Sequence, residues 1–304
     1  MAGGWWERFS SRLPSAADAR EPFGEELRRH WGDGSQARLL IYTPPHETVK
    51  ARSPASVLAL SNQEWMLVEE MADGSVRVTR SDYDRTLWVE LTSILLYGAL
   101  RIAFFTETGS GSVSVEFNTV ARRYYDEAIQ RVLDGMDGIE ACPPVDPGEW
   151  EPLLEPLPLK FRNAFPRFTP PGQCLLALVA WPAVLGARRR WFQHELCPEA
   201  VLAFTNRELL LISEEATWTW LRLGRNDKYG FIITHCPFSR LAGWRVQPGD
   251  PLATLELSLR AGRGTDVLRI NFPGDRHGEV TRLLERAMAQ SPSGNPGRRP
   301  AEPA

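Results

Sequence analysis

Val57-Leu-Ala-Leu-Ser-Asn-Gln-Glu-Trp-Met-Leu-Val-Glu-Glu70 is matched later in the chain by Val201-Leu-Ala-Phe-Thr-Asn-Arg-Glu-Leu-Leu-Leu-Ile-Ser-Glu214. Seven of the fourteen positions are identical at a constant offset of 144 residues, and four others are close substitutions. Internal similarity of this kind indicates a duplicated structural unit. Each stretch predicts two apolar strands joined by a tight turn, with Asn62 or Asn206 in the left-handed conformation that such turns favour.

The residues that follow each copy also match in kind, because both continue with two short strands around a glycine-rich turn. The predicted strand, turn and strand are residues 100–105, 109–111 and 113–117 in the first copy, and residues 253–259, 262–264 and 267–272 in the second. Alternation of apolar and polar residues in 113–117 is typical of a strand with one buried face. The two hairpins occupy corresponding places in the two copies.

Each copy then ends in a pattern that predicts an amphipathic helix. The apolar positions at helical spacing are Val120, Tyr124, Tyr125, Ala128, Ile129 and Val132 in the first copy, and Val280, Leu283, Leu284, Ala287 and Met288 in the second. Asn118 or Thr119 is the expected N-cap of the first helix, and Gly135 its expected end. Asp275 is the expected N-cap of the second.

These patterns predict a mainly β protein with α-helices (α+β), in which two units of six or seven antiparallel strands are each closed by one C-terminal amphipathic helix. On the leading strand pairs and these helices, the chain resembles the bacterial pleckstrin-homology-like (PH-like) and GRAM-like families. The resemblance covers roughly residues 35–136 and 172–290, and it implies two tandem PH-like half-barrels.

Segments outside the two copies have different compositions. Residues 1–34 are expected to form an N-terminal extension with one or two short helices. Residues 137–171 contain nine prolines and an excess of acidic residues, which predicts an extended and stiff linker. Residues 291–304 are expected to form a disordered tail.

Charge and composition restrict the class of function. The chain has 304 residues and a net charge of -3, which argues against nucleic-acid binding. The two copies differ in the sign of their net charge. Residues 35–136 have 10 basic and 13 acidic side chains, and residues 172–290 have 15 basic and 12 acidic side chains. Four scattered cysteines favour a reducing compartment. The sequence shows neither a secretory signal nor a membrane-spanning stretch. We therefore expect a cytoplasmic protein, and the alternative is peripheral attachment to the inner face of the membrane.

The first candidate site is the run Arg188-Arg189-Arg190-Trp191-Phe192, which we expect in the connection between the first two strands of the second unit. In lipid-binding members of the resembled family, this connection holds phosphates. Three guanidinium groups beside two aromatic rings suit an anionic lipid or a protein partner. The alternative is a solvated loop whose arginines pair with Glu195 and Glu199.

A second candidate is an interfacial helix that includes Trp5, Trp6, Phe9 and Leu13. Trp6, Phe9 and Leu13 would share one helical face that could rest at a membrane surface. Because a helix of under three turns is marginal by itself, docking of these side chains on the first unit is the favoured alternative.

A metal site would need ligands such as His194, Cys197, His235 and Cys236, whose residue types suit zinc. Neighbouring strand residues such as His235 and Cys236 point to opposite faces, so joint ligation is awkward. We therefore predict neither a metal site nor a small-molecule cofactor, and interpret the cysteines as small apolar residues.

Motifs of known enzyme classes were not found, and the chain is interpreted as a non-catalytic module that binds a protein or peptide partner through exposed loops or a sheet edge. The second hypothesis is peripheral association with an anionic membrane through Arg188–Phe192. The third is a hydrolase whose catalytic groups, such as His46, Ser93 and Ser239, are assembled in space. The paired carboxylates Glu69-Glu70 and Glu214-Glu215 are interpreted as solvated strand ends.

Overall fold

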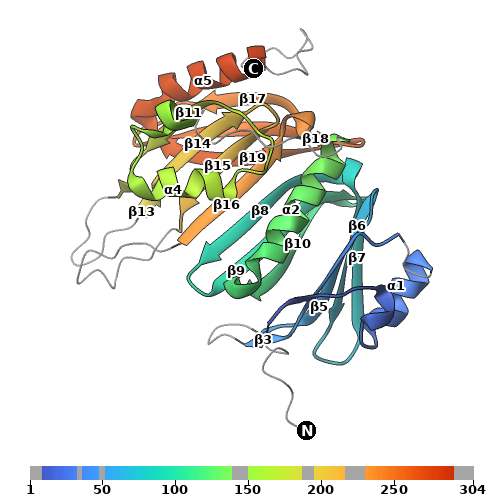
Figure 1. Ribbon diagram of the computed structural model, residues 1–304. Helices are drawn as coiled ribbons and strands as arrows, with labels where there is room; N and C mark the ends of the chain where they lie inside the picture. Colours follow the sequence, from blue (N-terminus) through green and yellow to red (C-terminus); the bar gives the residue numbers. More distant parts are fainter. Residues whose placement is uncertain are drawn as a thin grey trace. The chain divides into compact units, whose positions relative to one another are not determined.

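The computed structural model describes residues 9–32, 36–47, 52–138, 150–186, 195–215 and 230–290. The chain divides into two compact units, unit 1 (Met1–Glu140) and unit 2 (Ala141–Ala304). Both consist largely of antiparallel strands with a few helices, which confirms the predicted mainly β, α+β class (Figure 1).

Unit 1 begins with a short strand and a helix, continues through antiparallel sheets and ends in a second helix. Its elements are β1 (Ser11–Arg12), α1 (Phe23–Trp31), β2 (Leu39–Thr43), β3 (His46–Glu47), β4 (Arg52–Ser53), β5 (Ala55–Leu60), β6 (Glu64–Glu70), β7 (Val76–Asp82), β8 (Thr86–Ile94), β9 (Tyr97–Thr106), β10 (Gly109–Asn118) and α2 (Arg122–Asp137). The first sheet has the order β1-β2-β5-β6-β7, β3 pairs with β4, and the second sheet runs β8-β9-β10.

Unit 2 starts with two helices and then repeats the order of elements that unit 1 has from β2 onward. Its elements are α3 (Glu151–Leu154), α4 (Leu159–Phe168), β11 (Leu175–Trp181), β12 (Val184–Leu185), β13 (Glu195–Cys197), β14 (Ala200–Thr205), β15 (Glu208–Glu214), β16 (Gly230–Pro237), β17 (Leu241–Gln247), β18 (Leu252–Ala261), β19 (Gly264–Pro273) and α5 (His277–Gln290). Its first sheet runs β11-β14-β15-β16, β12 pairs with β13, and its second sheet runs β17-β18-β19.

The repeated hairpin has the same strand register in both units. Val57 pairs with Val68 in unit 1, and Val201 pairs with Ile212 at the same offset in unit 2. A slip of one residue would have turned every side chain to the opposite face. The duplication seen in the sequence therefore extends to the pairing of the backbone.

The second sheets match as well. A β-bulge interrupts β8 between Thr86 and Trp88, and a bulge at the corresponding place interrupts β17 between Leu241 and Gly243. The two long hairpins also share one register, since Thr106 pairs with Gly109 in unit 1 and Ala261 pairs with Gly264 in unit 2. Bulges are specific features of a strand, so the shared bulge is strong support for a common ancestor of the two units.

The hairpin turns differ from the expectation in one respect. Residues 107 and 108 make the turn in unit 1, so the predicted turn 109–111 is already part of β10. The turn of unit 2 likewise consists of residues 262 and 263.

The turn of the repeated hairpin is held by a hydroxyl group, and the prediction of a left-handed asparagine was wrong. Among the described residues, Leu95 is the one non-glycine residue with a positive φ, so neither Asn62 nor Asn206 has that conformation. Ser61 Oγ accepts hydrogen bonds from the backbone N–H groups two and three residues later, at 3.1 and 3.0 Å. Thr205 Oγ1 accepts the equivalent pair at 3.1 and 3.0 Å. Two backbone donors are thus satisfied without a strained residue.

Helix α2 begins at Arg122, after a 3-10 turn (Thr119–Ala121) that Asn118 caps, and it ends later than predicted. Asn118 Oδ1 accepts a hydrogen bond from the N–H of Val120 at 3.0 Å, as a cap does, whereas the Val120 side chain points to solvent. The helix continues through Gly135 and ends at Gly138, which has the left-handed conformation. A Cβ atom on Gly135 would lie 2.3 Å from Cδ2 of Tyr83, so this glycine allows a close approach to the ring. A glycine that ends a helix and a glycine that allows close packing cannot be distinguished in sequence, so the predicted helix end at Gly135 was wrong.

Helix α5 buries Val280, Leu283 and Leu284, in agreement with its predicted apolar face. Asp275 lies inside the 3-10 turn Gly274–Arg276 that precedes the helix, and it is not the N-cap.

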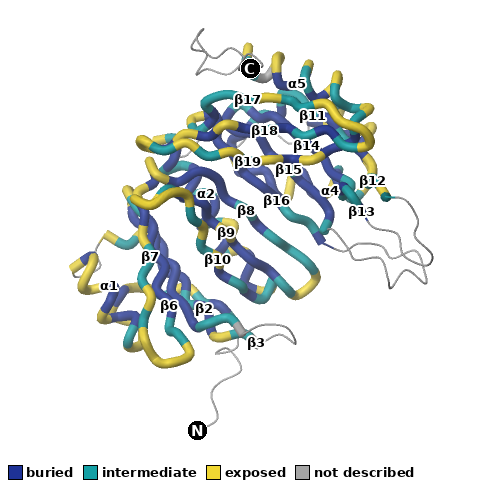
Figure 2. The backbone as a smooth tube through the Cα atoms, turned by 180° about the vertical axis from the view of Figure 1, so that it is seen from behind, coloured by how far each residue is buried: buried dark blue, intermediate teal, exposed yellow. Residues whose placement is uncertain are grey.

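Helix α1 packs on the outer face of the first sheet of unit 1. The buried cluster that joins them consists of Ala16, Ala19, Phe23, Leu27, Trp31, Leu40, Ala55, Val57, Ala59, Met66 and Val68. All residues of β5 are buried, which explains why this strand is a continuous apolar run rather than an alternating one (Figure 2 shows the same burial along β6). The opposite side of α1 is polar.

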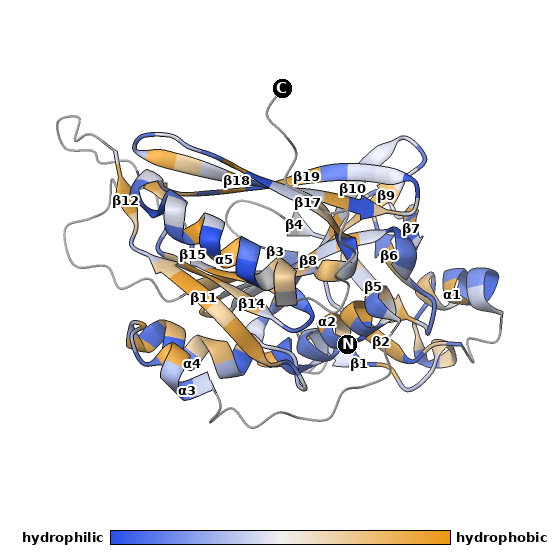
Figure 3. Cartoon of the chain, turned by 90° about the horizontal axis from the view of Figure 1, so that it is seen from above, coloured by the Kyte–Doolittle hydropathy of each residue, from blue (hydrophilic) through white to orange (hydrophobic). Residues whose placement is uncertain are grey.

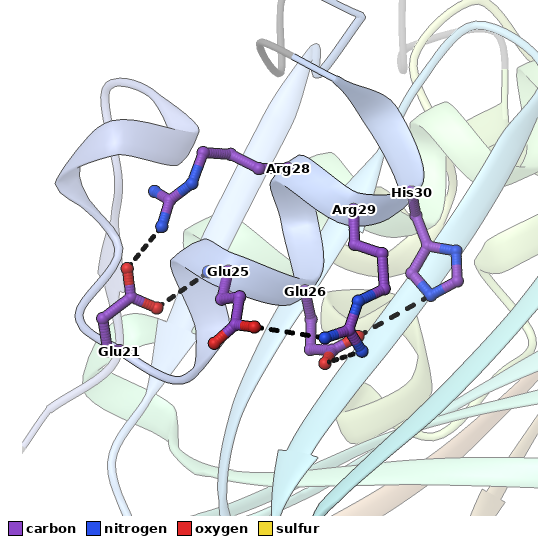
Figure 4. A network of polar contacts seen from close by, with 6 residues as sticks. All are labelled: Glu21, Glu25, Glu26, Arg28, Arg29 and His30. Atoms are coloured by element: carbon purple, nitrogen blue, oxygen red, sulfur yellow. Dashed lines mark hydrogen bonds and ion pairs between the residues drawn. The ribbon is translucent and has the colours of Figure 1, made fainter.

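Ion pairs cover that polar side of α1 (Figure 4). Arg28 lies 2.5 Å from Glu21, and Arg29 lies 2.5 Å from Glu26 and 3.1 Å from Glu25. Exposed pairs of this kind each contribute little to stability. The network therefore marks a solvent-facing surface.

Residues 150–168, part of the expected extended linker, form helices in unit 2. Phe161 and Phe165 of α4 are fully buried, and the rings of Phe161 and Phe168 each lie 5.9 Å from the ring of Phe231 in β16. The prolines predict extended chain, but Pro158 is the N-cap of α4, where a helix tolerates proline, and Pro166 lies within the last turn of that helix. Helix α4 covers the sheet whose strands β11 and β14 are apolar (Figure 3), as α1 does in unit 1.

Candidate functional site

The segment Arg188-Arg189-Arg190-Trp191-Phe192 lies outside the described residues. In the chain it falls between β12 and β13, the second and third strands of unit 2. Of the acidic residues considered as partners for these arginines, Glu199 accepts a hydrogen bond from Lys160 at 2.7 Å.

Trp5 and Trp6 also lie outside the described residues, but the two other residues of the proposed interfacial helix are described. Leu13 packs against the buried cluster beneath α1, and Phe9 lines a cavity of unit 1. Ser11 and Arg12 between them form strand β1, paired with β2, so this part of the chain is not helical. Phe9 and Leu13 are therefore placed on unit 1.

A cavity of about 230 Å³ lies at the end of β10, beside the connection between β2 and β5. Its lining residues are Phe9, Ser10, Thr43, Pro44, Pro45, His46, Glu116, Phe117 and Asn118. Tyr97 donates a hydrogen bond to Glu116 at 3.1 Å, and the hydroxyl of Ser53 donates to the other carboxylate oxygen. Glu116 is thus held in place by two hydroxyl groups while it forms part of the cavity wall.

A second cavity, of about 410 Å³, is lined by Arg20, Pro45, Pro54, Ala55, Glu70, Met71, Ala72 and Gly74. Arg20 and Glu70 form an ion pair of 2.5 Å in its wall. Pro45 belongs to both cavities, so the connection between β2 and β5 separates two hollows of unit 1.

Three of the four carboxylates that we interpreted as solvated strand ends, Glu69, Glu70 and Glu214, are engaged in ion pairs. Glu69 is buried and pairs with Arg77 at 2.8 Å. Glu214, at the place of Glu70 in the repeat, is buried and lies 2.5 Å from Lys160 of α4. Burial lowers the pKa of the Lys160 ammonium, but its hydrogen bonds with two glutamates outweigh this and leave the pKa raised. Lys160 thus joins α4 to the first sheet of unit 2, and Arg20, which precedes α1, makes the corresponding contact with Glu70 in unit 1, whereas Glu69–Arg77 joins β6 to β7.

The candidate site also includes the outer edge of β10, which is the side of this strand that faces away from β9. In the described part of the chain, β10 ends the sheet order β8-β9-β10 and pairs with β9 alone. Gly109, Ser110, Ser112 and Ser114 are exposed, and the strand carries a single charged residue, Glu116. An exposed edge without lysine or proline offers backbone N–H and C=O groups to a further strand.

The corresponding strand of unit 2 is protected. Strand β19 occupies the place of β10, and it carries Asp266, Arg269 and Pro273. Charged side chains and proline are the usual means by which proteins prevent pairing at a sheet edge. The difference assigns the accessible edge to unit 1.

Unit 2 contains a buried polar cluster that the sequence did not reveal. His235 Nδ1 lies 3.2 Å from the carboxylate of Glu208, and Gln173 donates to the same carboxylate at 2.8 Å. Burial raises the pKa of the neighbouring Cys236 thiol to about 12, and the charge of Glu208 adds to the effect. A neutral buried thiol is a poor nucleophile and a poor metal ligand.

The described residues contain no group of three or more His, Cys, Asp or Glu side chains that could hold a metal ion. His194, one of the four weighed in the sequence, lies outside them. None of the helices in the described part of the chain is both long and apolar enough to cross a membrane.

The residues named for a hydrolase lie on separate elements. His46 lines the smaller cavity, Ser93 belongs to β8, and Ser239 belongs to the 3-10 turn Phe238–Arg240 of unit 2. Within the cavity wall, Ser53 donates its hydroxyl proton to Glu116. That bond fixes Ser53 as a support for the carboxylate.

Comparison with known proteins gives this chain no family. A scan against models of protein families found no match, and a search of curated proteins found none either.

Proposed function

We propose that the chain is a non-catalytic binding module of two PH-like half-barrels, each closed by its C-terminal helix, and that unit 1 recognises a protein or peptide partner. The order of elements in both units supports the proposal: a helix, a first sheet, a second sheet and a terminal helix, with equal registers in the strands compared. Tyr125 of α2 stacks on Phe117 of β10 with ring centroids 3.6 Å apart, as a closing helix would.

The accessible edge of β10 carries the binding proposal. A partner in extended conformation would add a strand beside β10 and exchange backbone hydrogen bonds with it. Backbone pairing gives affinity without a particular residue type, while a side-chain pocket supplies specificity. The cavity lined by Phe9, His46 and Phe117 lies at the end of the same strand and would receive one side chain of the partner.

Lysine substitution of the β10 edge tests this function. Ser112→Lys with Ser114→Lys places two charges at exposed positions, where they oppose the approach of another strand. The matched control is Thr265→Lys with Val267→Lys on β19, at the places of Ser110 and Ser112 in the repeat. We expect proteins captured from the native cell extract by the wild-type chain to be retained by the control and lost by the β10 variant.

Hydrogen exchange then locates the contact on the chain. With a captured partner bound, the backbone amides of β10 should exchange more slowly than in the free protein, and those of β19 should be unchanged. Equal capture by the β10 variant, or protection confined to other strands, would exclude the edge as the site. Loss of capture on changing Arg188, Arg189 and Arg190 to alanine would instead support the loop of unit 2.

A further inference from the structure

Three large aliphatic side chains lie together and exposed at one end of unit 1. Leu95 and Leu96 form the turn between β8 and β9, and Val120 lies in the 3-10 turn before α2. Their exposed fractions are 69%, 66% and 67%. Thr119 joins the two segments, because its N–H donates to the carbonyl of Leu96 at 3.1 Å and its hydroxyl donates to that of Leu95 at 2.6 Å. We call Leu95, Leu96 and Val120 the apolar tip.

The tip is unfavourable for the unit by itself. Leu95 has a φ of 49°, in the left-handed region that leucine rarely adopts. Its side chain is exposed, so packing does not offset the strain. A two-residue hairpin turn needs a positive φ, which glycine or asparagine usually supplies, so an exposed leucine at this position is a candidate for a functional contact.

Unit 2 has a turn at the same place with other side chains and another backbone conformation, since Asp250 lacks the positive φ of Leu95 and the Asp250–Pro251 peptide bond is cis. The hydrogen bond that holds the tip has a counterpart of 2.8 Å from the N–H of Gly274 to the carbonyl of Pro251. At the places of the three tip residues, unit 2 has Asp250, Pro251 and Asp275. The fold therefore accepts aspartate here, and the aliphatic residues of unit 1 are not required for folding.

The surroundings of the tip suit a lipid surface. Arg123 is exposed and stacks on Tyr124, with its guanidinium carbon 4.8 Å from the ring centre. Residues 94–98 and 118–124 contain no acidic residue. Aliphatic side chains flanked by tyrosine and arginine are the composition that enters the interface of a bilayer containing anionic lipid. The exposed side chains of Leu95, Leu96 and Val120 could enter a fluid bilayer directly, because a bilayer needs no preformed pocket.

We propose that the apolar tip of unit 1 inserts into the surface of a membrane that contains anionic lipid, with Arg123 at the level of the headgroups. The proposal is independent of strand addition at β10, because it rests on different residues. It also differs from a role for Arg188–Phe192, which belongs to unit 2.

Flotation with vesicles tests the insertion. The probes are vesicles of phosphatidylcholine alone and of phosphatidylcholine mixed with phosphatidylglycerol, at about 100 mM salt. We expect the wild-type chain to float with the mixed vesicles, and the variant with Leu95→Asp and Val120→Asp to partition at least about tenfold less. The control is Leu159→Asp, which charges an equally exposed leucine (68%) on α4 and should leave partitioning unchanged.

A reciprocal exchange makes the test specific. Asp250→Leu with Asp275→Val gives unit 2 the aliphatic residues of the tip, and it should raise partitioning of the tip-charged variant. Circular dichroism and thermal unfolding should show that all variants are folded. The proposal is overturned if the wild-type chain does not float, or if the tip-charged variant floats as well as the wild type. Flotation that is lost only on changing Arg188, Arg189 and Arg190 to alanine would likewise overturn it in favour of that loop.

Discussion

The hydroxyl of Tyr125 lies 2.6 Å from Thr43 Oγ1, which joins the terminal helix of unit 1 to its first long strand. In unit 2 the corresponding positions hold Val280 and Trp181, so the large ring comes from the strand and the small side chain from the helix. Trp181 lies 5.9 Å from the ring of Phe272, much as Tyr125 stacks on Phe117. The space between the terminal helix and the sheets is therefore filled by a ring from the helix in unit 1 and by a ring from the first strand in unit 2.

Burial raises the pKa of Tyr125 to about 12, while its hydrogen bonds with Ser10 and Thr43 act in the opposite direction. Because the unfolded tyrosine has a pKa of about 10, the folded state holds its proton more tightly, and stability should fall as pH rises from about 10 to 12. The decrease from this group is at most about 2–3 kcal/mol. Urea unfolding at about pH 7 and about pH 10.5 measures the first part of this decrease, about 1 kcal/mol.

Tyr125→Phe provides the control for that titration. The variant should lose about 1 kcal/mol at neutral pH, because Thr43 and Ser10 lose a hydrogen-bond partner. Its stability should then decline less steeply than that of the wild type above about pH 10. An equal decline in both proteins would show that Tyr125 does not carry the alkaline sensitivity.

Gly135→Ala should destabilise the protein by about 1–3 kcal/mol, because the new methyl group would meet the Tyr83 ring. Gly278→Ala is the matched control on α5, where a Cβ atom meets nothing within 4 Å. That variant should gain up to about 1 kcal/mol from helix propensity. Thermal unfolding of both variants checks the pair, and a neutral Gly135→Ala would contradict the close approach of α2 to Tyr83.

Ser61→Ala should destabilise unit 1 by about 1 kcal/mol, since two backbone N–H groups of the turn lose their acceptor. Asn62→Gly should bring no stabilisation, because Asn62 does not have the left-handed conformation that glycine would relieve. Chemical denaturation distinguishes the two effects. A stabilising Asn62→Gly would restore the turn that the sequence suggested.

Phe165→Ala should cost about 3–5 kcal/mol, because this fully buried ring of α4 packs within unit 2. Leu159→Ala on the same helix removes an exposed side chain and should change the free energy of unfolding by less than about 0.5 kcal/mol. Urea unfolding gives both values. If Phe165→Ala were as mild as the control, residues 150–168 would behave as the extended linker and not as part of unit 2.

Periodicity and repetition in the sequence predicted the parts of the fold that depend on local pattern. The repeated hairpin, the β-rich units and the terminal helices fall in this class, because burial of one or both faces dictates which residues are apolar. Turn chemistry was less accessible. Ser61 and Asn62 are both common turn residues, and only the backbone angles show which of them holds the turn.

The candidate site depends on relationships that a sequence does not display. Whether β10 lies at an edge follows from sheet order, and a cavity at Phe9, His46 and Glu116 follows from segments distant in the chain. One signal was present, however. Aligning the copies sets Leu95 against Asp250 and Val120 against Asp275, and such a change of character between duplicated units indicates where one copy has its own role.

Cross-strand nuclear Overhauser effects between backbone protons test the duplication most directly. We expect such effects between Val57 and Val68 and, in the same register, between Val201 and Ile212. In the second sheets we expect Leu91 opposite Leu100 and Val246 opposite Leu255. A register in unit 2 that is displaced by one residue from that of unit 1 would contradict the claim that the two units are copies of one fold.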